Sequence, residues 1–202
     1  MAVLAAMLVC CGCAAQPADA GSALFATEDG RMTFTFPAGW TADAESRAFD
    51  LVCRDEAREL SAGVFSYTRE GAAMPFEPSE ALDFHVEDFC ARLEDAGEPG
   101  GKEERADGGH SFTSVLLEAG GTAYYFTLIE FSGYSGRFAV AVMTCPAAAF
   151  EAEHARFDAI AASAALAEEP PGPAPRGQAA ETRFPCVFAV DIGRAGGYTT
   201  KR

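Results

Sequence analysis

The alternation of apolar and polar residues predicts three short strands in the first third of the chain. Threonine and phenylalanine alternate over residues 33–36, and the run stops at Pro37, whose ring removes the next backbone donor. Residues 37–40 are expected to form a turn. Similar short runs follow at residues 49–53 and 64–68. We expect these three strands to open one β-sheet.

A helical period begins at Ser79, a residue type that favours the N-cap position. Apolar residues recur at helical spacing, at Leu82, Val86, Phe89 and Leu93. The opposite face is acidic and carries Glu80, Asp83, Glu87 and Glu94. These two stripes predict an amphipathic helix over residues 79–96 that ends at Gly97. The charged, glycine-rich residues 98–109 are expected to form a loop.

Three closely spaced strands are predicted at residues 111–118, 122–131 and 137–145. In the middle strand, TAYYFTLIEF, both alternating sets of side chains are apolar, so both of its faces must be covered. A closing helix that begins after Pro146 supplies one cover. Its apolar face carries Phe150, Phe157, Ile160, Ala161 and Ala164. The whole pattern predicts an α+β fold, in which an antiparallel β-sheet of about six strands is flanked by helices.

We expect residues 27–167 to form a single domain, because a chain of 202 residues, 49% of them hydrophobic, can bury one large core. Residues 168–202 begin with the proline-rich linker EEPPGPAPRG, which favours neither helix nor strand. The later run RFPCVFAVDI has the composition of a short added strand, and the remainder is expected to be a loose tail.

The chain opens with MAVLAAMLVCCGCAAQPADA, in which the first charged residue is an aspartate near the end. The apolar run is shorter than the roughly 20 residues that span a bilayer, but it has the shape of a secretory signal. Gly12 followed by Cys13 resembles the cleavage and acylation site of bacterial lipoproteins, and Cys11 is the second candidate. We therefore expect a signal peptide at residues 1–12, lipidation of Cys13 and a tether at residues 13–26.

Two other interpretations of this opening are a buried N-terminal helix and half of a zinc site. A structural zinc site takes four ligands in two spaced pairs, and the CCGC cluster has no matching pair. The first basic residue is Arg31, so the charged start of a secretory signal is missing, which points to a true start upstream of Met1.

The formal charge of −15 argues against nucleic acid as a partner, because phosphate neutralisation needs clustered Lys and Arg, and the 15 present are scattered. The same charge repels anionic lipid headgroups from the folded surface. Contact with the membrane is therefore expected through the N-terminal lipid.

No catalytic apparatus is evident, since the chain has no GxSxG-like nucleophile elbow. The histidines are His85, His110 and His154. His154 lies on the apolar stripe of the closing helix and is predicted to be a hydrogen-bonded boundary residue. With Glu151 it forms one Glu-x-x-His pair, but di-iron helices need two. We expect a protein that is not an enzyme and has no cofactor.

The acidic helix face supports an alternative function, metal binding or delivery with help from His85 or His154. The carboxylates concerned are Glu80, Asp83, Glu87 and Asp88. No DxDxDG loop accompanies them, so a solvated helix face is the preferred interpretation. Phe84 points toward the same side, and an exposed aromatic residue there would mark a docking spot.

Four cysteines follow the predicted cleavage site, and they are Cys53, Cys90, Cys145 and Cys186. An even number in an oxidising compartment favours disulfides, but three connectivities are possible and the sequence does not choose among them. The other interpretation is that Cys53, on the same face as Phe49 and Leu51, is a small buried hydrophobe.

The order of these parts resembles the PsbP-like class, which includes the photosystem extrinsic protein PsbP and bacterial DcrB-type lipoproteins. The resemblance lies in FTFPAGW, the helix at 79–96, TAYYFTLIEF followed by FAVAVMTCP, and the closing FDAIAASAAL, and it covers residues 27–166. It implies an antiparallel sheet flanked by helices and a non-catalytic accessory role, exerted by docking onto other proteins. We expect a membrane-anchored extracytoplasmic lipoprotein that binds an unidentified envelope protein.

Overall fold

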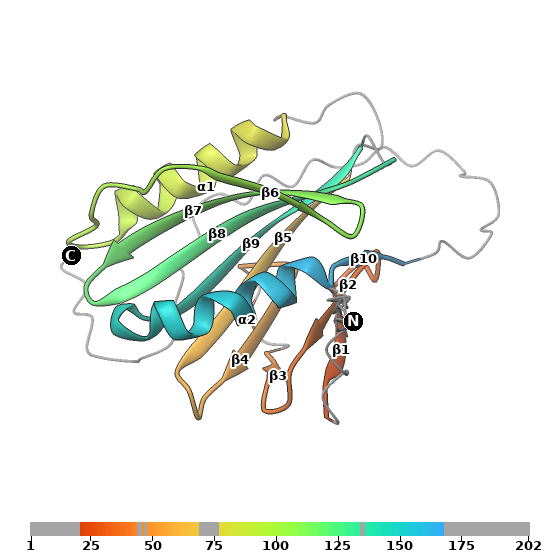
Figure 1. The fold of residues 1–202 in the computed structure, drawn as a ribbon, viewed down its shortest axis with the longest axis horizontal. Coiled ribbons are helices and arrows are strands. Elements are labelled where there is room, and N and C mark those ends of the chain that lie inside the picture. Colours follow the sequence, from red (N-terminus) through yellow and green to blue (C-terminus); the bar gives the residue numbers. More distant parts are fainter. Residues whose placement is uncertain (1–20, 44–45, 47, 69–76, 134–135, 168–202) are drawn as a thin grey trace, which may run out of the picture.

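The computed structural model describes residues 21–43, 46, 48–68, 77–133 and 136–167. Within these ranges the chain forms two β-sheets and two α-helices, shown in Figure 1. The expectations for the leader, for Cys13 and for the tail at residues 168–202 fall outside the described residues. Neither described helix is long and apolar enough to cross a bilayer.

The larger sheet has seven antiparallel strands and is built around the predicted meander. In spatial order the strands are β3 (Thr41–Ala42), β4 (Leu51–Asp55), β5 (Leu60–Thr68), β9 (Arg137–Pro146), β8 (Thr122–Phe131), β7 (His110–Ala119) and β6 (Glu103–Asp107). Ala119 pairs with Thr122, so β7 and β8 are joined by a two-residue turn. Gly120 and Gly121 in that turn have φ of 55° and 82°, which glycine adopts without strain.

A separate three-stranded sheet contains the first predicted strand. It consists of β1 (Ala23–Ala26), β2 (Met32–Phe36) and β10 (Ala165–Leu166), in the order β1-β2-β10. The prediction that β2 opens the same sheet as β4 and β5 was therefore wrong, because alternation identifies the buried face of a strand and not its neighbours. β1 also lies within the segment expected to be tether.

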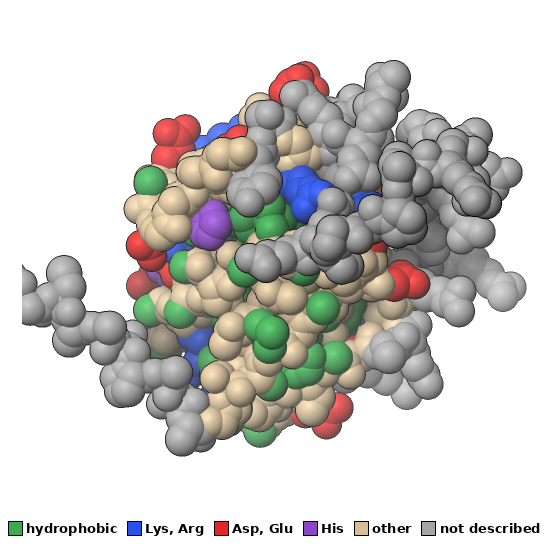
Figure 2. All heavy atoms as spheres, turned by 90° about the vertical axis from the view of Figure 1, so that its right-hand side faces the viewer, with side chains coloured by type: hydrophobic (Ala, Val, Ile, Leu, Met, Phe, Trp, Pro, Cys, Tyr) green, Lys and Arg blue, Asp and Glu red, His purple; other side chains and the backbone are tan. Residues whose placement is uncertain are grey.

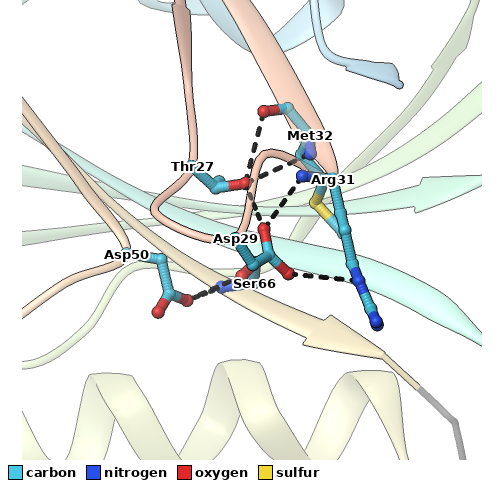
Figure 3. A network of polar contacts seen from close by, with 6 residues as sticks. All are labelled: Thr27, Asp29, Arg31, Met32, Asp50 and Ser66. Atoms are coloured by element: carbon cyan, nitrogen blue, oxygen red, sulfur yellow. Dashed lines mark hydrogen bonds and ion pairs between the residues drawn. The ribbon is translucent and has the colours of Figure 1, made fainter. Parts of the chain in front are cut away.

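The small sheet is fastened to the rest of the molecule by polar contacts (Figure 3). In the turn between β1 and β2, Thr27 Oγ1 donates to Asp29 Oδ1 at 2.7 Å and accepts from the Met32 N–H at 3.1 Å. The next backbone N–H, of Glu28, donates to the Asp50 carbonyl at 2.7 Å. The Asp50 carboxylate accepts from the N–H and the hydroxyl of Ser66 on β5, at 2.6 and 2.7 Å. Asp50 therefore links the turn to the large sheet.

Both faces of the large sheet are covered, as the pattern of β8 predicted. Helix α1 (Pro78–Arg92) lies on one face, while α2 (Phe150–Ala162) and the small sheet lie on the other (Figure 1). A 3₁₀ turn, η1 (Ala147–Ala149), leads from β9 into α2. The face of α1 buries Leu82, Val86 and Phe89 with Tyr124, Phe126 and Leu128 of β8. The other face buries Tyr125, Ile129 and Phe131 of β8 with Phe150, Phe157 and Ile160.

The bounds of α1 differ from the prediction at both ends. The helix begins at Pro78 with Glu77 as N-cap, and the Glu77 N–H donates to Glu80 Oε2 at 2.9 Å. Proline fits the first helical position because its fixed φ suits a helix and its missing N–H would have no helical partner. The helix ends at Arg92, four residues before the predicted end at Ala96, which instead pairs with Ala119 of β7.

The predicted loop at residues 98–109 contains strand β6, which pairs with β7 from Glu103↔Ser114 to Asp107↔His110. β6 is an edge strand whose sequence, EERAD, is almost entirely exposed and charged. Charged residues protect the open edge of a sheet, but they remove the apolar alternation by which a strand is recognised.

Figure 2 looks onto the end of the molecule at which the small sheet lies. Hydrophobic side chains gather in the lower half of this face, and acidic side chains lie around its edge. Leu24 of β1 is 67% exposed and is one of two large, strongly exposed hydrophobic residues in the described part of the chain. The other is Phe84 of α1.

Replacing Phe157, which is fully buried between α2 and the large sheet, is expected to destabilise the fold. Phe157→Ala should lower the free energy of unfolding by about 3 to 5 kcal/mol, through lost burial and the cavity left behind. Leu24→Ala is the matched control at an exposed position and should change it by less than about 0.5 kcal/mol. Urea unfolding of both variants measures this, and equal effects would contradict the core assignment.

Candidate functional site

The outer surface of α1 combines acidic side chains with an exposed aromatic ring. The inner stripe of the helix is buried and consists of Ala81, Leu82, His85, Val86 and Phe89. Glu80 and Glu87 are exposed on the other side, and the Asp83 side chain is 49% exposed. Phe84 is 46% exposed among them. The predicted acidic face and the outward direction of Phe84 are therefore both found, and we call this surface, Glu80, Asp83, Phe84 and Glu87, the α1 face.

A shallow groove of about 200 Å³ runs beside the α1 face. It is lined by Asp83, Val86, Glu87, Pro99, Gly100, Lys102 and Val115. The valines come from the inner side of α1 and from β7, and the carboxylates stand on one wall. Lys102 stands on the other wall and forms an ion pair with Asp83, with Nζ and Oδ1 2.6 Å apart.

Gly100 holds the second wall of the groove against β7. Its N–H donates to the Leu116 carbonyl at 2.8 Å. A Cβ atom at Gly100 would lie 3.3 Å from that same oxygen, so a larger residue would push the wall outward. The sequence pattern gives no sign of this groove, because its second wall comes from a segment that carries no periodic signal.

His85 points inward from α1 and not toward the carboxylates. It is 5% exposed, its ring stacks on Phe65 with centroids 3.9 Å apart, and its Nε2 lies 2.5 Å from Tyr67 Oη. Burial lowers the pKa of His85 from 6.5 to about 4. Burial, reinforced by the negative charge of Asp50, raises the pKa of Tyr67. Both groups are therefore neutral at pH 7.

The metal-binding alternative gains no support from this arrangement. His85 cannot join Asp83 and Glu87 as a ligand while its ring is held in the core. Within the described ranges, no three side chains of His, Cys, Asp or Glu are grouped so as to hold a metal ion. His110 stands apart at the start of β7, with its ring edge-on to Phe131 at 5.0 Å.

His154 is a hydrogen-bonded boundary residue, as predicted. Its Nε2 lies 3.1 Å from Tyr125 Oη, and the Tyr125 hydroxyl donates to Asp158 Oδ1 at 3.0 Å. Arg105 of β6 lies 2.8 Å from the same Asp158 oxygen, and its guanidinium sits over the Phe112 ring at 4.4 Å. Burial, together with Asp158, raises the pKa of Tyr125, so its hydroxyl keeps its proton.

This cluster joins α2 to the sheet by pairing one acid with one base, so it leaves little charge for a ligand. Glu151 is exposed and takes no part in any of these contacts, which fits a solvated residue beside a boundary histidine. The sequence pattern does not bring Tyr125 and Arg105 together with His154, because they come from separate strands. The spacing of four between His154 and Asp158 on one helix was the only local signal.

The three described cysteines, Cys53, Cys90 and Cys145, are free. Burial raises the pKa of Cys53 to about 12 and the pKa of Cys145 to about 11, so both are inert thiols. Cys53 is fully buried, which fits its interpretation as a small hydrophobe. Cys186 falls outside the described residues, so a bridge to it is not tested.

The seven-stranded antiparallel sheet, covered by one helix on each face, defines a PsbP-like fold. The solution structure of cyanobacterial PsbP (CyanoP) from Synechocystis sp. PCC 6803 superposes with a TM-score of 0.53 at 16% sequence identity, covering 78% of this chain and 97% of that chain. The predicted resemblance is therefore confirmed for the fold.

Two further solved structures superpose less closely. The Ran-binding protein Mog1p of Saccharomyces cerevisiae gives a TM-score of 0.47 at 14% identity, covering 72% of this chain and 95% of that chain. LpqN, a protein of Mycobacterium tuberculosis involved in cell envelope biogenesis, gives 0.46 at 12% identity, covering 73% and 91%. No protein-family model and no curated protein matches the sequence.

The buried His85 should make stability depend on pH. Its folded pKa of about 4 lies below the usual 6.5, so the unfolded chain binds more protons between these values. The contribution of His85 to the free energy of unfolding is complete above pH 6.5 and is lost as the pH falls toward 4. Lowering the pH from 7.5 to 4.5 should therefore cost about 2 to 3 kcal/mol through this residue.

Urea unfolding at the two pH values measures this loss. His85→Gln, which does not titrate, should lose about 2 to 3 kcal/mol less than the unsubstituted protein over the same range. His154→Gln, at a histidine on the boundary of the fold, is the matched control substitution. An unchanged dependence in His85→Gln would show that another group is responsible.

Proposed function

We propose that this protein is an extracytoplasmic lipoprotein, acylated at Cys13, whose PsbP-like domain is a non-catalytic accessory module that binds another protein of the cell envelope. The observation that carries the proposal is the α1 face, where the half-exposed ring of Phe84 stands among carboxylates beside a groove with an apolar floor and charged walls. Buried aromatic anchors dominate the energy of many protein interfaces, and a half-exposed aromatic ring offers such an anchor.

The sequence of the leader supports the tether. An apolar run that is too short to span, followed by Gly12 and Cys13, fits a signal that is removed before an acylated cysteine. One acyl chain binds a membrane weakly, whereas the two or three chains of a lipoprotein give stable attachment. The described fold starts only a short distance later, with β1 at Ala23–Ala26, so the domain would be held close to the membrane.

The chemistry of the described residues supports a non-catalytic role. Catalytic groups combine a shifted pKa with a position in a cleft that substrate can reach. The shifted groups here are enclosed. Burial is the largest cause of the shift for Cys53, Tyr67, His85, Tyr125 and Cys145.

The tether is tested by changing the acylated residue. In a bacterial host, the unsubstituted protein should be recovered in the membrane fraction with the mass of its acyl chains on Cys13, and Cys13→Ala should lose both. Cys11→Ala is the matched control and should keep both. Recovery of the chain from the cytosol, with residues 1–12 attached and without acyl mass, would contradict the proposal.

The accessory role is tested by partner recovery. A tagged protein cross-linked in intact envelopes should retain a defined partner, and Cys13→Ala should recover at least tenfold less of it, because attachment raises the local concentration of both proteins. Equal recovery from both forms, measured by quantitative mass spectrometry, would mean that the tether does not serve the interaction.

A further inference from the structure

The negative charge of the molecule is concentrated around α1. Residues 77–104 contain ten acidic and two basic residues, a net charge of −8 out of −15 for the whole chain. Both basic side chains in this segment form ion pairs with α1, Arg92 with Asp88 at 2.7 Å and Lys102 with Asp83 at 2.6 Å. More than half of the excess charge therefore surrounds one helix and its groove.

The same surface offers apolar contacts. Pro99 lines the groove and is exposed, while Val86 and Val115, 6% and 4% exposed, form its floor. Phe84 lies next to it, because Glu87 is three residues after Phe84 and four after Asp83 and so neighbours both on the helix. An occupant of this surface would need apolar side chains for the groove and for Phe84, and positive charges for the carboxylates around them.

The tether proposed above makes the lipid surface an unsuitable occupant. α1 lies on the opposite face of the large sheet from α2, and away from the small sheet, whose first strand follows the leader (Figure 1). A domain held through β1 therefore presents its small sheet to the membrane and its α1 face to the surroundings. Anionic headgroups would also repel the α1 face.

A second copy of the chain is excluded by the same charge, since two faces with this excess of carboxylates would repel each other. A cationic segment of another protein has the required complementarity. The Lys102–Asp83 ion pair does not prevent entry, because the two side chains are 44% and 49% exposed and a pair this exposed contributes less than about 1 kcal/mol.

We propose that the α1 face and its groove bind a cationic peptide segment of an envelope protein. An apolar side chain of the segment packs on Pro99 over the floor formed by Val86 and Val115, and a second one covers Phe84. Lysine or arginine side chains pair with Asp83 and Glu87 in exchange for Lys102. This inference rests on the proposed function, and it names the chemistry of the partner and the surface that receives it.

The test uses the full-length protein and three labelled peptides of twelve residues. One alternates lysine with leucine, one alternates glutamate with leucine, and one alternates lysine with serine. Acylated protein is held in phosphatidylcholine nanodiscs, with empty nanodiscs as the blank, and protein recovered without acyl mass is assayed in plain buffer. Failure of the tether therefore leaves the peptide assay intact, and the two proposals can fail separately.

Fluorescence anisotropy should show that the lysine–leucine peptide binds at least tenfold more tightly than either of the other two. Phe84→Ala should weaken its binding at least tenfold, and so should the double variant Asp83→Asn with Glu87→Gln. The matched controls are Leu24→Ala, at the other strongly exposed apolar residue, and Glu151→Gln, at an exposed carboxylate of α2. Both should remain within twofold of the unsubstituted protein.

Three results would overturn the proposal. Equal affinity for the lysine–serine peptide would mean unspecific attraction of charge, and unchanged binding in the α1-face variants would place the site elsewhere. Stronger binding to phosphatidylglycerol vesicles than to any peptide would make the occupant a lipid surface. If sedimentation shows a dimer and Phe84→Ala dissociates it, the occupant of the groove would be a second copy of the chain.

Discussion

The burial of β8 and β9 on both faces is the constraint on which the rest of the structure depends. In each strand nearly every side chain is buried, whichever way it points. A sheet with two apolar faces is stable in water only as the middle layer of three. The chain meets this requirement unequally, since α1 alone lies on one side in the described residues, and α2 shares the other side with the small sheet.

This unequal cover decides which surfaces remain for function. On the α2 side, polar side chains are used to join elements. The Thr35 N–H of β2 donates to Ser163 Oγ at the end of α2, at 2.8 Å, and Asp158 pairs with Tyr125 and Arg105. On the other side, α1 packs on the sheet through its inner stripe, and its outer surface carries Phe84 and the carboxylates, of which Asp83 pairs with Lys102. Charge and an aromatic ring can collect there without disturbing the core.

Sequence periodicity predicted the parts of the fold that bury apolar surface. β7, β8 and β9, both helices and the outward direction of Phe84 follow from which residues must leave water. Three features do not follow from periodicity. The strands that pair with β2 depend on contacts with the end of α2, more than a hundred residues away, and β6 is a charged edge strand. The start of α1 is set by Glu77 and Pro78 in place of the expected Ser79.

The groove beside α1 could not be predicted from the sequence for a related reason. The Gly100 N–H fixes the second wall to β7 and the Lys102 side chain connects it to α1, and neither residue belongs to a periodic pattern. The lowered pKa of His85 could not be predicted from the sequence either. Helical spacing gives the direction of the side chain, but it does not show that the ring of Phe65 and the hydroxyl of Tyr67 enclose the imidazole.

The contrast between the two sides of α1 bears directly on function. Inward, His85 and Tyr67 are shifted in pKa mainly by burial, and they satisfy each other with one hydrogen bond. Groups of that kind stabilise a core, because they are neutral, enclosed and already paired. Outward, the carboxylates stand in excess over their cations in water, where a partner's charge can reach them at a small cost in desolvation. The proposed recognition therefore uses the outer side of α1.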